Sequence, residues 1–187
     1  MIKFVSALLL ISALQSQAQE KPEGLFINSK APDFKGKDQN GNEIVLKDLR
    51  KKGPVVIIFY RGYWCPYCNK ELQKLEDSLQ LIRQAGAQLI AITPEKQEGI
   101  AKTIEKTKAS YPIITDDELK IMKAYDVAYQ VDTKTIDRYK MASIDLAANN
   151  GQKPDAVYLP VPAVYIIGKD GKLNIDFLKR IIRNRQR

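Results

Sequence analysis

The stretch VVIIFYRGYWCPYC, residues 55–68, decides the fold and contains both cysteines of the chain, Cys65 and Cys68. Residues 55–60 are apolar, with β-branched and aromatic side chains and no alternation, which is typical of a strand buried on both faces. A helical pattern begins at Pro66. The two cysteines are therefore expected at a strand-to-helix turn.

The pattern after the turn predicts one helix over residues 66–85. Gly86 supplies its end. Apolar residues in this stretch recur at spacings of four and three, which places them in a single stripe along one face of the helix. The stripe consists of Cys68, Leu72, Leu75, Leu79 and Ile82.

The two sulfurs are expected to differ. Pro66 suits the first helical position, where a missing N–H costs nothing, so Cys65 falls at the N-cap. A thiolate there faces free N–H groups and the positive end of the helix dipole, and Arg61 is a further source of positive charge. We therefore expect a lowered pKa at Cys65, which makes it the attacking thiol. Cys68 begins the apolar stripe and is expected to be more buried, as the resolving thiol.

Other roles for these residues are possible. A purely structural disulfide would close a loop of about four residues and stabilise the fold by only roughly 2 kcal/mol. A copper-carrying dithiol would lack nearby methionine or histidine ligands. Trp64 either belongs to the active site or simply packs the loop.

The absence of histidine narrows the chemistry further. It excludes Ser-His and Cys-His catalytic pairs, histidine-ligated zinc, and haem with a proximal histidine. Two cysteines cannot complete a four-cysteine zinc site within one chain. Among the chemistries that remain for the two cysteines, thiol–disulfide exchange is the one that the sequence favours. The sequence predicts no cofactor and no metal.

The flanking elements predict an α/β fold with a central mixed β-sheet flanked by helices. Asn40-Gly41 indicates an N-terminal hairpin, and residues 47–52 are expected to be a polar connection. Residues 128–160 are expected to be an insertion with one or two helices. The remaining expected elements are strands at 87–93, 111–115 and 163–167, helices at 94–108 and from 116 onward, a hairpin turn at 168–172, and a last helix from Asp176.

The N-terminus has the pattern of a secretory signal peptide over residues 1–18, with Lys3, a short apolar stretch and small residues before the cut. We therefore expect an exported, periplasmic or extracellular protein, with residues 19–187 as one domain and no stable membrane anchor. Loss of Lys3 lowers the net charge from +8 to +7. The basic C-terminal residues favour a solvated helix end over a nucleic-acid partner.

Several motifs resemble the redoxin group of the thioredoxin superfamily, most closely the alkyl hydroperoxide reductase and thiol-specific antioxidant family. The central match is the R-G-x-W-C-P-x-C motif at residues 61–68. Flanking matches lie at Ala31-Pro32-Asp33-Phe34, Ile92-Thr93-Pro94 and residues 162–167.

This resemblance implies a thioredoxin-like fold with a peroxiredoxin-type N-terminal β-hairpin extension, a hydroperoxide substrate and a thioredoxin-type reductant. It also implies that Pro162 is a cis-proline facing the dithiol. When the sequence is aligned with the active-site motif of peroxiredoxins, however, Cys68 occupies the position of the peroxide-reacting cysteine. Cys65 then occupies the threonine position of that motif, and Arg61 its proline position. Helix-end chemistry thus favours Cys65 as the nucleophile, whereas the peroxiredoxin pattern favours Cys68.

Three functions follow from these observations. The first is an antioxidant enzyme that reduces hydroperoxides through the Cys65/Cys68 pair. The second is a thiol–disulfide oxidoreductase that attacks protein disulfides with Cys65. The third is a binding module that keeps the fold and uses its basic tail for a partner.

Overall fold

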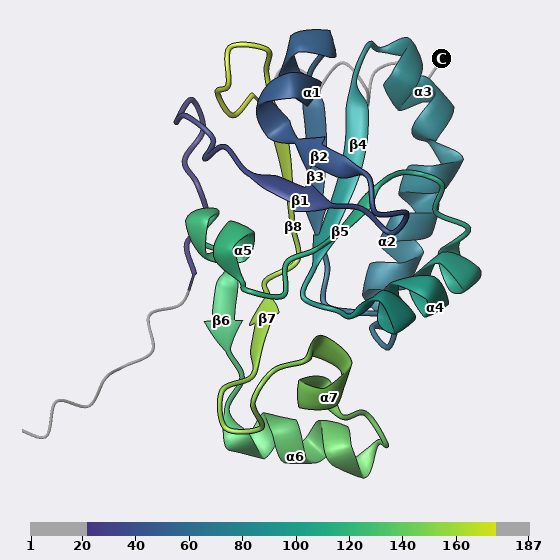
Figure 1. Cartoon of the computed structure of the whole chain (residues 1–187), viewed down its shortest axis with the longest axis vertical. Coiled ribbons are helices and arrows are strands. Elements are labelled where there is room, and N and C mark those ends of the chain that lie inside the picture. The colour runs from purple at the N-terminus through teal and green to yellow at the C-terminus, as the bar shows by residue number, and fades with distance from the viewer. Residues whose placement is uncertain (1–21, 175–187) are drawn as a thin grey trace, which may run out of the picture.

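The computed structural model describes residues 22–174, and Figure 1 shows their arrangement. The predicted signal peptide and the predicted last helix lie outside the described residues. The centre is a four-stranded sheet in the order β5-β4-β3-β8, in which β3, β4 and β5 are parallel and β8 is antiparallel to β3. This is the predicted thioredoxin-like mixed sheet, formed by β3 (Val55–Phe59), β4 (Gln88–Thr93), β5 (Ile113–Thr115) and β8 (Ala163–Ile167).

Strand β3 is buried along its whole length, as predicted, because its side chains alternate between two cores. Val56 and Ile58 belong to one core and Val55, Ile57 and Phe59 to the other. The first core is covered by α2 (Pro66–Asp77), α3 (Leu79–Gln84) and α4 (Gln97–Thr107), and the second by α1 (Leu46–Lys52) and α5 (Lys120–Ala124).

The predicted N-terminal hairpin is present, with β1 (Lys35–Lys37) antiparallel to β2 (Glu43–Val45). Within its turn, the Gln39 side chain donates to the Tyr111 carbonyl and accepts from the Ile113 amide, which ties the hairpin to the β5 edge. The polar connection expected at residues 47–52 is wrong, because these residues form most of α1. Leu46 is fully buried in the second core and anchors that helix.

The single helix expected over residues 66–85 is also wrong, because the chain forms α2 and α3 with a break at Ser78. The Ser78 backbone has φ −100° and ψ 0°, and its hydroxyl donates to the Lys74 carbonyl at 2.7 Å. Such a bond competes with regular helix geometry. The apolar stripe survives the break, since all five of its residues pack in or against the first core. Gly86, with φ +76°, follows the end of α3 as predicted.

Residues 128–160, here called the 128–160 segment, leave and re-enter the domain through two paired strands. These are β6 (Ala128–Gln130) and β7 (Tyr158–Pro160), and between them lie α6 (Thr133–Met141) and α7 (Leu146–Asn150). In Figure 1 the two helices lie beyond the end of the central sheet. The segment has a core of its own, made by Val131, Ile136, Leu146, Ala147, Val157 and Leu159.

Candidate active site

Cys65 and Cys68 form a disulfide at the turn between β3 and α2, with their Cα atoms 5.3 Å apart. Cys65 is the N-cap residue of α2 and Pro66 occupies the first turn, as the sequence predicted. The loop is closed by a backbone hydrogen bond from the Cys65 amide to the Gly62 carbonyl at 3.0 Å. The chain can therefore interconvert a dithiol and a disulfide at a helix N-terminus.

Two donors converge on the Cys65 sulfur. The Cys68 backbone N–H lies 3.2 Å from it, and the Arg61 Nη2 atom also lies 3.2 Å from it. In the reduced protein, both donors would stabilise a thiolate at Cys65 and lower the pKa of that thiol. This geometry favours Cys65 over Cys68 as the nucleophile.

Burial differs from the expectation that Cys68 would be the more buried sulfur. Cys65 is 1% exposed and Cys68 is 5% exposed, and both belong to the first core. The helical stripe correctly placed Cys68 in this core. The stripe could not predict the burial of Cys65, because that burial depends on side chains outside the helix that pack over its N-terminus. Trp64 is one of these and lies against the same core.

Trp64 packs in two directions. It lies against the first core and also against the core of the 128–160 segment. There its ring centroid is 4.9 Å from the ring centroid of Tyr139, and the two rings meet edge to face. The Arg61 guanidinium carbon lies 5.8 Å from the Trp64 ring centroid. Trp64 therefore joins the cysteine loop to the 128–160 segment.

Gly62 allows two groups to approach the loop closely. A Cβ atom at this position would lie 2.5 Å from Trp64 Nε1 and 2.8 Å from Glu95 Oε1. Any residue with a Cβ atom at position 62 would displace both of these groups. The glycine of the R-G-x-W-C-P-x-C motif is thus required here by packing.

Pro162 does not have the conformation that the family resemblance implies. No peptide bond among residues 22–174 is cis, so the Val161–Pro162 bond is trans. Pro162 is exposed between β7 and β8, and the Val161 amide before it donates to the Val127 carbonyl at 2.8 Å. Trans is also the usual state of an X-Pro bond.

Glu95 is a buried group at the site that the sequence analysis missed. Its Oε1 atom accepts from the Tyr63 amide at 2.8 Å, and its Oε2 atom accepts from the Thr103 hydroxyl at 3.3 Å. Burial raises the pKa of Glu95 to about 7, and these hydrogen bonds limit the rise. Burial, together with the Glu95 charge, also raises the pKa of Tyr60 well above its ordinary value.

A sequence signal for Glu95 does exist. It follows β4 directly, and β4 is parallel to β3, which leads into the cysteine loop. The carboxyl ends of neighbouring parallel strands meet at one edge of a sheet. A carboxylate two residues past the second strand is thus a candidate neighbour of the loop that follows the first.

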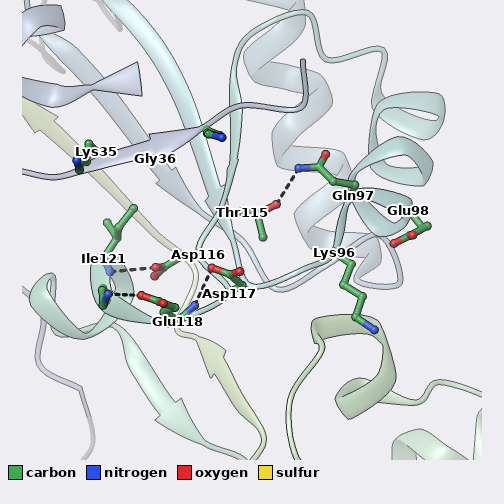
Figure 2. Close-up of a pocket in the computed structure, with 12 residues that line it drawn as sticks. Lys35, Gly36, Lys96, Gln97, Glu98, Thr115, Asp116, Asp117, Glu118 and Ile121 are labelled. Atoms are coloured by element: carbon green, nitrogen blue, oxygen red, sulfur yellow. Dashed lines mark hydrogen bonds and ion pairs between the residues drawn. The ribbon is translucent and has the colours of Figure 1, made fainter. Parts of the chain in front are cut away.

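A separate cavity of about 580 Å³ lies between β1, the start of α4 and the turn before α5 (Figure 2). The Gln97 amide there donates to the Thr115 hydroxyl, and Asp116 accepts from the Ile121 and Met122 amides at the start of α5. None of the six residues predicted for the site lines this cavity. Its lysines and acidic residues are mixed, so no single ligand charge is favoured.

Among the described residues, neither a metal site nor a membrane span is found. Over residues 22–174, no group of three or more cysteine, aspartate or glutamate side chains is placed to hold a metal ion. No helix in that range has the length and apolar character needed to cross a membrane.

Replacing Arg61 with methionine should raise the pKa of the reduced Cys65 thiol, because it removes the cation beside the sulfur but keeps an apolar stem. We expect alkylation of Cys65 by iodoacetamide at pH 7 to slow about tenfold. The measurement uses a Cys68→Ser background, so that Cys65 is the one thiol that iodoacetamide can alkylate. Arg138→Met, an exposed arginine on α6, is the matched control. Equal slowing by both substitutions would contradict the role of Arg61.

Comparison of the sequence with known proteins assigns the chain to a family. The family model described as AhpC/TSA family matches residues 27–175. The chain is 28% identical to the thiol-disulfide oxidoreductase ResA of Bacillus subtilis over 107 residues, 57% of this chain and 59% of the relative. It is 33% identical to the peroxiredoxin Bcp of the same organism over 101 residues, 54% of this chain and 64% of the relative. Both matches therefore span less than two thirds of the relative.

A solved structure agrees on the fold. The peroxidoxin BcpB from Mycobacterium tuberculosis superposes with a TM-score of 0.61 and 22% identity, covering 79% of this chain and 81% of that chain. At this identity the likeness establishes the thioredoxin-like fold alone. Because the family model spans most of the chain, the protein belongs to the AhpC/TSA family.

Proposed function

We propose that this protein is a thiol oxidoreductase that reduces hydroperoxides through Cys65 and Cys68. The observation that carries the proposal is the environment of the Cys65 sulfur. It receives two donors at 3.2 Å, one of them cationic, in a site where Cys65 is only 1% exposed. A small oxidant suits such a site better than a folded protein does.

The cycle has three steps. In the first, the Cys65 thiolate attacks one peroxide oxygen, the O–O bond breaks, and the leaving alkoxide or hydroxide takes up a proton, which leaves a Cys65 sulfenic acid. In the second, the Cys68 thiol displaces water from that sulfenic acid and the disulfide forms. In the third, a dithiol donor of the thioredoxin type reduces the disulfide and is itself oxidised.

The third step makes a different demand on the structure from the first. A protein donor must reach a disulfide sulfur, whereas the described conformation buries both cysteines. Since this conformation already contains the disulfide, re-reduction by a protein donor requires the loop to open. The proposed setting is the periplasm or the extracellular space, on the strength of the signal-peptide pattern at residues 1–18.

Stopped-flow mixing of the fully reduced protein with hydrogen peroxide tests the proposal. The expected result is a rapid single oxidation that consumes one peroxide per protein and ends in the Cys65–Cys68 disulfide. A rate no faster than that of free cysteine would rule out hydroperoxides as the substrate.

The second candidate function is reduction or exchange of protein disulfides. It is favoured by the N-cap position of Cys65 and by the similarity to the ResA relative, whose name describes this activity. Reduction of insulin with dithiothreitol as the electron source distinguishes the two functions. Fast insulin reduction together with slow peroxide turnover would select this second function.

A further inference from the structure

Tyr63, two residues before Cys65, is the point at which the cysteine loop meets α4. Two lysines of that helix face its ring, with the Lys102 and Lys106 Nζ atoms 4.7 and 5.1 Å from the ring centroid. The lysines are four positions apart in the helix, so they lie on the same side of α4. Both cations are therefore directed toward the loop that carries the disulfide.

The backbone of Tyr63 is held by three side chains. Its amide donates to Glu95 Oε1 at 2.8 Å. Its carbonyl accepts from the Asn69 side chain at 2.8 Å and from Lys106 Nζ at 3.1 Å. Cation–π contacts on a ring that is anchored in this way keep the two ammonium groups in place, so less side-chain freedom is lost when a partner binds them.

The two cations are available to a partner. Lys102 and Lys106 are both exposed. Among residues 22–174, no carboxylate lies within ion-pair distance of either ammonium group, although Glu98 and Glu105 are exposed on the same helix. The positive charge beside the cysteine loop is thus not neutralised within the described part of the chain.

We propose that Tyr63, Lys102 and Lys106, here called the lysine patch, form the docking surface for an acidic protein that re-reduces the Cys65–Cys68 disulfide. Carboxylates of this donor pair with the two ammonium groups. The Tyr67 ring, which lies between the cysteines in the sequence and is 80% exposed, supplies an apolar contact.

The docked donor then carries out the reduction in two exchanges. A donor thiolate attacks one sulfur of the disulfide and gives a mixed disulfide, which the second donor thiol breaks. Two electrons and two protons pass to the cysteine pair, and the donor leaves as a disulfide. The inference rests on the dithiol–disulfide cycle of the proposed function and not on its peroxide step.

The sign of the charge selects the class of donor. Opposite charges attract each other over about a Debye length, so a donor with carboxylates around its own dithiol meets the loop more often and in the right orientation. A basic donor would be repelled by the lysine patch and by Arg61, which lies 3.2 Å from the Cys65 sulfur. The net charge of the whole chain, +8, adds a general attraction that the test has to separate from the local one.

The test measures reduction of the disulfide by a reduced thioredoxin of net negative charge. Acid quenching followed by mass spectrometry counts the free thiols of this chain. In Lys102→Gln/Lys106→Gln, the second-order rate constant at about 20 mM salt should fall about fivefold, because exposed charges at an interface act mainly on association. At about 500 mM salt the difference from the wild type should shrink to less than about twofold, because salt screens these charges.

Dithiothreitol, which carries no carboxylate, is the second reductant. Its rate constant should differ by less than about twofold between the double variant and the wild type. Lys102→Gln alone, which leaves the hydrogen bond from Lys106 to Tyr63 intact, should slow the acidic thioredoxin about twofold. Lys106→Arg, which keeps the charge, should react with this donor at the wild-type rate.

Lys35→Gln/Lys37→Gln is the matched control. It removes the same charge from two exposed lysines, which lie on β1 and line the separate cavity. With the acidic thioredoxin it should keep the wild-type rate constant at low salt. A fall as large as that of Lys102→Gln/Lys106→Gln would mean that the donor responds to net charge alone, and would overturn the docking role.

An equal change with both reductants would also overturn it, because the lysines would then act on the loop and not on the donor. The test begins with the disulfide and uses no peroxide, so its outcome is independent of the oxidising substrate. Slow oxidation by hydrogen peroxide, together with the expected effects of the lysine variants, would refute the proposed function and leave the docking surface standing.

Discussion

Replacing Cys65 with serine should slow the oxidation of the reduced protein by hydrogen peroxide about a thousandfold, because it removes the one sulfur that receives the Arg61 and Cys68 donors. Replacing Cys68 with serine should leave this first step nearly unchanged. The Cys68 backbone N–H is retained in that variant, and so is Arg61. The two substitutions therefore distinguish an attacking sulfur from a resolving one.

The products provide an independent measurement. In Cys68→Ser, Cys65 should accumulate as a sulfenic acid that dimedone traps, and mass spectrometry should find the label on residue 65. The opposite result, with activity kept in Cys65→Ser and lost in Cys68→Ser, would show that the peroxiredoxin pattern identifies the nucleophile and that helix-end geometry does not.

Glu95→Gln should change how stability depends on pH. The pKa of Glu95 rises from its ordinary value of 4.5 to about 7 in the folded protein. Between these values the folded protein keeps a proton that the unfolded chain has released, so the free energy of unfolding falls as pH rises through this window. The shift corresponds to about 3 kcal/mol, lost progressively from about pH 4.5 to above pH 7.

Glutamine does not titrate, so the variant should lack this loss. Urea unfolding from pH 4 to pH 8 should show the difference between variant and wild type moving by about 3 kcal/mol in favour of Glu95→Gln. Glu98→Gln, an exposed glutamate in the first turn of α4, should retain the wild-type slope. Parallel curves for Glu95→Gln and wild type would mean that the carboxyl group titrates normally.

The parts of the site that the sequence predicts depend on local rules. The β-rich run at residues 55–60 indicates a strand buried on both faces, and Pro66 fixes the helix start that makes Cys65 its N-cap. The spacing from Cys68 onward identifies the apolar face of α2 and α3. Each inference uses residues that belong to one strand or one helical stretch of the sequence.

The parts that sequence analysis missed depend on residues far apart in the chain. Glu95 reaches the loop across a strand pair, and Tyr139 reaches Trp64 from a helix more than seventy positions away. The burial of Cys65 has the same origin, since helical periodicity describes only one face of one helix. Periodicity also cannot show where a hydroxyl such as that of Ser78 will interrupt a helix.

The position of Trp64 between two cores has a thermodynamic consequence for the redox couple. If disulfide formation alters how Trp64 packs, then the stability of the 128–160 segment and the reduction potential of the cysteine pair are linked, and the linkage is reciprocal. For a two-electron couple, each 1.4 kcal/mol of such coupling corresponds to about 30 mV. Substitutions inside the core of that segment, with no contact to sulfur, would then tune the electron affinity of the disulfide.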